Sequence, residues 1–298
     1  MKNTIFTGSG VALVTPFDRA LQVDYNRLEQ LVAFQIQEGT DAIIACGTTS
    51  EASTMTEAEH KDVISFIIEK VKGRIPVIAG TGSNDTKFCL ELSLEAKNLG
   101  ADGLLLVTPY YNKTSQAGLV AHFNYVADHV KLPCIVYNVP SRTALNILPE
   151  TYLELSKNPY IVATKEANGN ISALAHTMAL CGDNLDIYTG EDDLTLPVMA
   201  MGGKGVISVF ANALPGIMHQ LTAALLQEDL PTARAIATEY QDLMRGFFMD
   251  VNPVPVKEAM NMMGILCGDC RMPLVGMSEE NRRKMRTLLQ KHQLIASN

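Results

Sequence analysis

The sequence predicts an α/β protein with a (β/α)8 TIM-barrel fold and a C-terminal helical extension. Short apolar runs alternate with amphipathic helical patterns, and eight such runs are present. After about residue 210 the apolar runs stop while helical patterns continue. A doubly wound open sheet, which also alternates strands and helices, is the alternative fold.

The eight expected strands are continuous apolar runs, which is typical of strands that are buried on both faces of a parallel sheet. A hydrophobic fraction of 47% in 298 residues is sufficient for the core of one such barrel. The runs are residues 11–15, 42–47, 75–80, 103–109, 134–140, 161–165, 185–190 and 205–210.

Helix start and stop residues lie between the apolar runs. Asp24 suits an N-cap, and Gly39 ends the helical pattern that follows it. Thr56 and Glu59 have capping-box spacing before a pattern that ends at Gly73.

From about residue 213 the chain reads as helices only. Pro231 suits a first helical turn, and Ser278 suits an N-cap. We therefore expect a catalytic barrel at residues 1–225 and a C-terminal helical domain at residues 226–298.

Composition disfavours several classes of function. A formal net charge of −8 argues against a nucleic-acid partner, and no apolar run is long enough to span a membrane. Of six cysteines, only Cys267 and Cys270 are spaced as C-x-x-C, which is weak support for a metal site. We expect reduced core cysteines and a cytoplasmic location.

The chemistry of a barrel takes place where its strands end and its helices begin. Hydroxyls, phenols, one lysine and one arginine follow the expected strands, without the clustered histidines and carboxylates of a metal site. These candidates are Thr48, Thr49, Ser50, Tyr110, Tyr111, Tyr137, Arg142, Lys165, Glu166, Gly190 and Glu191.

Lys165 is the lysine that a strand delivers to this end of the barrel. Partial desolvation lowers the pKa of such an amine, and the neutral amine can form a Schiff base with a carbonyl. An ion pair with Glu166 or Glu191 is the alternative. Lys204, in the sequence GGKG, precedes its strand and belongs to the opposite end, which disfavours a phosphate loop there.

Three further groups could assist a Schiff base. Tyr137 could move protons with help from neighbouring hydroxyls, although most tyrosines only pack their rings. Backbone N–H groups of the GTTSE turn could hold a carboxylate or simply cap a helix. Arg142 could bind a second carboxylate bidentately or form a surface ion pair.

Six motifs occur in an order that resembles a known family. They are FTGSGVALVTPF, GTTSEAST, TPYYNKTSQAG, YNVPSRTA, TKEANGN and YTGED. Together they are similar to the pyruvate-dependent lyases of the class I aldolase superfamily, and within it to the dihydrodipicolinate synthase family, over almost the whole chain. The resemblance implies condensation of pyruvate with L-aspartate 4-semialdehyde, the first committed step of diaminopimelate and lysine synthesis, without a cofactor.

The resemblance also implies roles for residues of this chain. Pyruvate forms an imine on Lys165, and Tyr137 carries protons through a relay with Thr48 and Tyr111. The residues implied in substrate binding, besides Thr48, are Thr49, Arg142, Gly190 and Ile207. Family members are usually homotetramers, built as dimers of dimers, in which Tyr111 reaches into the neighbouring site.

Two other functions compete with this one. N-acetylneuraminate lyase and keto-deoxy sugar acid aldolases share the lysine and the tyrosine, but the arginine in NVPSRTA favours the synthase. A catalytically silent barrel is disfavoured, because it has no reason to retain the whole set of catalytic side chains.

The sequence departs from the family pattern at two places. Ser50 replaces the usual glycine of GTTGE, which leaves the mechanism in place. Residues matching the allosteric pocket of lysine-sensitive members are His60, Asn84 and Tyr110. Glu57 and Phe88 stand where those members carry a histidine and a glutamate, so we predict weak or absent inhibition by lysine.

Overall fold

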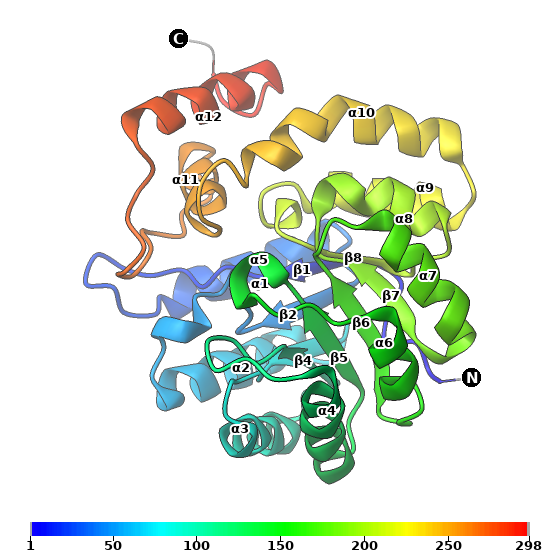
Figure 1. Ribbon diagram of the computed structural model, residues 1–298. Coiled ribbons are helices and arrows are strands. Elements are labelled where there is room, and N and C mark those ends of the chain that lie inside the picture. The colour runs from blue at the N-terminus through cyan, green and yellow to red at the C-terminus, as the bar shows by residue number, and fades with distance from the viewer. Residues whose placement is uncertain (1, 297–298) are drawn as a thin grey trace.

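The computed structural model, which describes residues 2–296, contains a closed barrel of eight parallel strands (Figure 1). Strand order around the barrel follows the chain, and the first strand pairs with the last. The strands are β1 (Gly8–Ala12), β2 (Ala42–Ala45), β3 (Val77–Gly80), β4 (Gly103–Val107), β5 (Cys134–Asn138), β6 (Ile161–Glu166), β7 (Asp186–Thr189) and β8 (Gly205–Ser208). The predicted barrel is confirmed, and the open-sheet alternative is wrong because β1 and β8 close the sheet.

The first strand begins earlier than expected. It spans Gly8–Ala12 and not residues 11–15. Gly8 pairs with Gly205 of β8, and a Cβ atom on Gly205 would lie 2.0 Å from the Gly8 carbonyl oxygen. Because neither glycine has a side chain, the two backbones can approach closely.

Helices cover the outside of the barrel. They are α1 (Tyr25–Gln37), α2 (Glu57–Val71), α3 (Thr86–Leu99), α4 (Gln116–Val130), α5 (Pro140–Thr143), α6 (Pro149–Leu155), α7 (Ile171–Cys181), α8 (Thr195–Ala200) and α9 (Pro215–Leu226). The predicted caps are confirmed: Asp24 accepts from the Arg27 N–H, and Thr56 and Glu59 form a capping box.

Apolar side chains form two separate cores. A larger cluster fills the space between strands and helices, and it contains all buried cysteines of the described residues. A smaller cluster fills the barrel interior and includes Phe6, Ile44, Ile135 and Tyr137. The second cluster supports the side chains that emerge at the carboxyl ends of the strands.

Three helices form the C-terminal extension, which Figure 1 shows along one side of the barrel. They are α10 (Leu230–Gly246), α11 (Val254–Met262) and α12 (Glu279–Lys291). Helix α10 contacts α8, α9 and the short 3-10 helix η3 (Asp192–Leu194), which follows β7. The expected division near residue 225 coincides with the end of α9, and two separate domains there stay a prediction.

Within residues 2–296, no helix combines the length and apolar character needed to cross a membrane. The same residues contain no group of three or more histidine, cysteine, aspartate or glutamate side chains arranged to hold a metal ion.

Candidate active site

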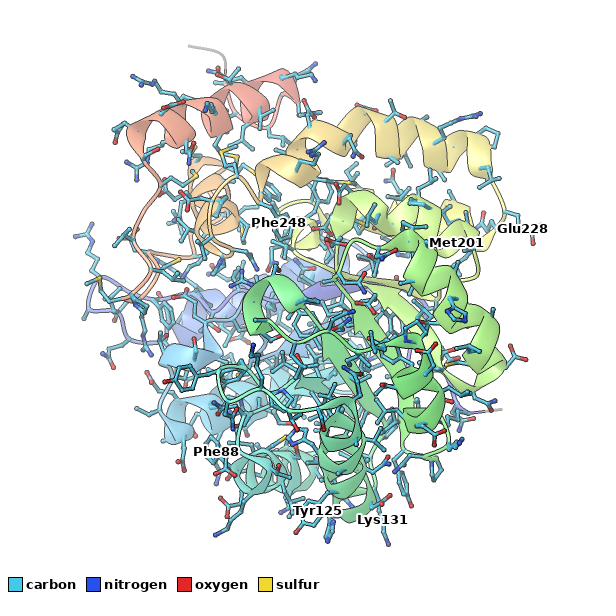
Figure 2. The ribbon with its side chains drawn as sticks, viewed as in Figure 1. Phe88, Tyr125, Lys131, Met201, Glu228 and Phe248 are labelled. Atoms are coloured by element: carbon cyan, nitrogen blue, oxygen red, sulfur yellow. The ribbon has the colours of Figure 1, made fainter. Side chains whose placement is uncertain are left out.

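A cavity of about 590 Å³ lies at the carboxyl ends of the strands. Its wall contains most of the candidate residues from the sequence, namely Thr48, Thr49, Tyr137, Arg142, Lys165, Gly190 and Glu191. The C-terminal extension completes the wall, and Figure 2 labels Phe248 of this wall in the segment that follows α10. The cavity is therefore built jointly by the barrel and the extension.

Lys165 lies on β6 beside Tyr137, its register partner on β5. Its Nζ atom is 4.3 Å from the centroid of the Tyr137 ring, and the residue is only 5% exposed. Burial lowers the pKa of Lys165 to about 8; the Asp192 charge opposes this shift and the Arg142 charge adds to it. A substantial fraction of the amine is therefore neutral near pH 8.

The ion-pair alternative for Lys165 does not hold. Within residues 2–296, no carboxylate oxygen lies within 4.0 Å of its Nζ atom. Successive strand side chains point to opposite faces, so Glu166 faces outward and accepts hydrogen bonds from Asn138 and Tyr152. Lys204 enters β8 and donates its backbone N–H to Ile187, at the amino ends of the strands.

Gly190 allows β7 to approach the lysine closely. A Cβ atom at this position would lie 2.7 Å from Lys165 Cε. The Gly190 N–H donates to the Glu166 carbonyl at 2.7 Å, which holds the two strand ends together. Any side chain here would displace the lysine.

Tyr137 is a buried phenol on the cavity wall. Burial raises its pKa to about 12, while Arg142 and a hydrogen bond with the Thr48 side chain oppose the rise. The phenol is therefore protonated near neutral pH and can donate its proton to a group in the cavity.

Thr48 and Thr49 lie in a tight turn after β2. Within this turn, Ser50 N–H donates to the Gly47 carbonyl and Glu51 N–H donates to the Thr48 carbonyl. We expected a helix to begin directly after this turn. The structure instead has the three-residue 3-10 helix η1 (Ala52–Thr54) there, and α2 begins only at Glu57. Ser50 donates its hydroxyl to the Leu13 carbonyl and lies off the cavity wall.

A buried ion pair, absent from the sequence prediction, holds this turn. Lys257 Nζ on α11 lies 2.9 Å from Glu51 Oε1, and both side chains are about 1% exposed. The same amine donates to the carbonyls of Thr15 and Asp269. The two charges are 206 residues apart in the chain, so no local pattern could reveal the pair.

Asp192 supplies negative charge near Lys165 and was not among the candidates predicted from the sequence. Its Oδ2 atom accepts from the backbone N–H groups of Val209 and Phe210, and burial raises its pKa to about 6. The sequence YTGEDD places three acids in a row, but only the fold selects the buried one.

Two expected site residues do not line the cavity. Tyr111 is 93% exposed in the single chain, with a backbone φ of 67°. Ile207 is fully buried in the barrel interior, among the residues that support the site. Their predicted roles stay predictions.

A second cavity of about 510 Å³ adjoins the first one at Thr48 and Tyr137. Two of the three residues expected in an allosteric pocket, His60 and Tyr110, line it together with Phe88, which Figure 2 labels on α3. The third, Asn84, lies on a different hollow and donates to the Tyr110 carbonyl.

Comparison with known proteins gives consistent matches. A model of the Dihydrodipicolinate synthetase family matches residues 5–292. A relative from Thermoanaerobacter sp. (strain X514), named 4-hydroxy-tetrahydrodipicolinate synthase, is 52% identical over 292 residues, or 98% of each chain.

Two solved structures have nearly the same fold. A chloride-inhibited dihydrodipicolinate synthase from Acinetobacter baumannii, complexed with pyruvate, has a TM-score of 0.96 at 40% identity and covers 98% of this chain and 100% of its own. A protein described as the first monomeric dihydrodipicolinate synthase variant has a TM-score of 0.95 at 39% identity, with 98% of both chains covered. These matches confirm the predicted family: the chain belongs to the dihydrodipicolinate synthetase family.

Proposed function

We propose that the activity of this chain, that of a 4-hydroxy-tetrahydrodipicolinate synthase, proceeds through an imine between pyruvate and Lys165. The enzyme is a lyase that joins pyruvate to L-aspartate 4-semialdehyde, on the pathway to diaminopimelate and lysine. The names of the relatives support this activity. The observation that supports the imine is a buried amine on the cavity wall with a pKa lowered to about 8.

The reaction starts when neutral Lys165 attacks the keto carbon of pyruvate and water leaves. Loss of a methyl proton gives an enamine, whose terminal carbon attacks the aldehyde carbon of the semialdehyde. The amino group of the second substrate then attacks the imine carbon, closes the ring and releases Lys165. These steps balance without a metal or an external cofactor.

Tyr137 is the central proton carrier of this scheme. Its raised pKa keeps the phenol protonated, although the nearby Thr48 side chain opposes that rise. Both groups lie on the wall that holds Lys165, so protons can pass between them and the reacting atoms.

Thr48 and Thr49 hold the pyruvate carboxylate. Within the described residues, their backbone N–H groups have no protein acceptor, which leaves them for an anion. Arg142, on the same wall, takes the carboxylate of the semialdehyde, and this arginine separates the proposal from the sugar-acid aldolase alternative.

A second copy of the chain supplies Tyr111 to the relay in this proposal. The extreme exposure of Tyr111 supports such a role, because the side chain has little contact with its own chain. The homotetramer and the cytoplasmic location stay predictions. Because one of the similar structures is described as a monomeric variant, the oligomeric state of this chain has to be measured.

Borohydride trapping tests the imine. We expect that reduction of the imine formed with pyruvate leaves a 1-carboxyethyl group on the peptide that contains Lys165, as located by mass spectrometry. Lys165→Met should abolish the adduct, whereas Lys204→Met, at the opposite end of the barrel, should retain it. Folded wild-type protein without any adduct would contradict the mechanism, and absent turnover with both substrates would contradict the activity.

Weak or absent inhibition by lysine is a further part of the proposal. Phe88 presents an apolar ring to the second cavity where lysine-sensitive relatives carry a glutamate, so an ammonium group finds no carboxylate from this position. We expect L-lysine to leave activity unchanged at sub-millimolar levels, and Phe88→Glu to increase sensitivity. Strong inhibition of the wild type in that range would refute this prediction.

A further inference from the structure

Asn252, in the segment between α10 and α11, contacts both groups to which we assign the substrate carboxylates. Its side-chain Nδ2 donates to Thr49 Oγ1 at 3.0 Å. Its backbone carbonyl accepts from Arg142 Nη2 at 3.0 Å. The residue lines the cavity and is only 7% exposed, so these contacts are shielded from bulk water.

The side-chain bond fixes the direction of the Thr49 hydroxyl. An amide nitrogen can only donate, so Thr49 Oγ1 must accept from Asn252. The single hydroxyl proton of Thr49 then remains for another acceptor, and within residues 2–296 no protein group takes it. An anion in the cavity would find that proton already available.

The amide oxygen of Asn252 supports a role of this residue other than stabilising the fold. Asn252 Oδ1 is buried and has no hydrogen-bond partner among the described residues. Leaving a buried acceptor unpaired is unfavourable, and such groups are uncommon in folded proteins. The side chain is therefore oriented by its contact with Thr49 and not by a full set of structural hydrogen bonds.

We propose that Asn252 is a positioning residue that directs the Thr49 hydroxyl toward the pyruvate carboxylate and fixes Arg142 for the second substrate. The inference rests on the proposed function. Its two contacts differ in kind, because Thr49 is held by the side chain and Arg142 by the backbone. A substitution at Asn252 removes the first contact and retains the second.

Steady-state kinetics of Asn252→Leu test this separation. We expect the KM for pyruvate to rise about tenfold, the loss of roughly one good hydrogen bond. The KM for L-aspartate 4-semialdehyde should stay within about twofold, because the carbonyl that holds Arg142 remains. A purely structural role would change both KM values together.

A double-mutant cycle with Thr49→Val identifies the route of the effect. If Asn252 acts through the Thr49 hydroxyl, Asn252→Leu should add little to the pyruvate KM of Thr49→Val. Multiplied effects in the double variant would overturn the inference, as would an unchanged pyruvate KM or an equal rise of both KM values in Asn252→Leu.

A second variant keeps the inference testable if Asn252→Leu does not fold. Asn252→Ser leaves a small side chain that no longer places an amide at Thr49, and it should show the same pyruvate-selective rise. A rise in both KM values for this variant would refute the inference. Wild-type protein without turnover would instead refute the proposed function, so the two failures are distinguishable.

Discussion

At Lys165, the chain places an ionisable amine near the end of a buried strand, and within the described residues no carboxylate oxygen lies within 4.0 Å of it. Burial disfavours the charged form, and this is the property that the proposed nucleophile needs. The same burial makes folding at neutral pH less favourable, because the ammonium group must be desolvated. Reactivity and stability are therefore opposed at this one residue.

Lys165→Met should abolish turnover and raise the free energy of unfolding at pH 7. The folded pKa is about 8 against 10.5 for the free side chain, which corresponds to an upper limit of roughly 3 kcal/mol. Between these pH values the unfolded state binds more protons, so wild-type stability rises with pH. The advantage of the variant should be full below pH 8 and shrink toward pH 10.5.

Urea unfolding of both proteins at pH 7 and pH 9.5 measures this difference. If Lys165→Met has a lower free energy of unfolding than the wild type at pH 7, the buried amine does not destabilise the folded state.

Helix α11, which is distant in the chain, contacts the turn that carries Thr48 and Thr49. Helix α11 supplies Lys257, whose buried amine pairs with Glu51 at the end of the turn that carries Thr48 and Thr49. Glu51 itself has a left-handed backbone, with φ of 60°, where side chains other than glycine are disfavoured. The ion pair helps to hold the turn in this conformation.

Lys257→Met should destabilise the protein by about 3–5 kcal/mol, because it leaves the Glu51 carboxylate buried without its partner. The double variant Glu51→Gln/Lys257→Met should recover part of this loss. Denaturant unfolding gives the values, with Lys284→Met as a matched control, since Lys284 pairs with Glu280 on the surface. Equal effects of the buried and the surface substitutions would contradict the assigned role.

The whole molecule builds its cavity from segments that are far apart in sequence. The barrel supplies the lysine, the phenol and the threonines, and the extension supplies a further part of the wall. Tyr111 does not line that wall in a single chain, and we propose that a second copy supplies it. On this proposal, activity depends on protein concentration, because dilution separates the two copies.

Tyr111→Phe should lower kcat by about 100-fold or more, within the range of roughly 10²–10⁴-fold that is usual for a proton-transfer group. Mixing Tyr111→Phe with Lys165→Met should restore part of the activity, because each variant supplies the residue that the other lacks. Tyr125 is another exposed tyrosine and lies on α4, and Tyr125→Phe should change kcat little. No gain on mixing, together with wild-type specific activity that is independent of dilution, would exclude the shared site.

The sequence by itself determined the barrel, the approximate positions of its strands and which lysine lies at their carboxyl ends. These follow from local periodicity and from the rule that chemistry lies at the carboxyl ends of parallel strands. The position of Lys165 at the carboxyl end of its strand was sufficient to separate it from Lys204, which precedes one. The exact start of β1 was missed because Gly8 and Gly10 interrupt the apolar run, whereas in the fold Gly8 pairs closely with Gly205 of β8.

Only the tertiary structure decided which groups surround that lysine. Asn252 meets Thr49 across 203 residues, and Lys257 meets Glu51 across 206. No local pattern encodes such contacts, because they arise from the packing of the extension against the barrel mouth. Burial, and with it the lowered pKa of Lys165, is likewise a property of the closed fold and not of the residue.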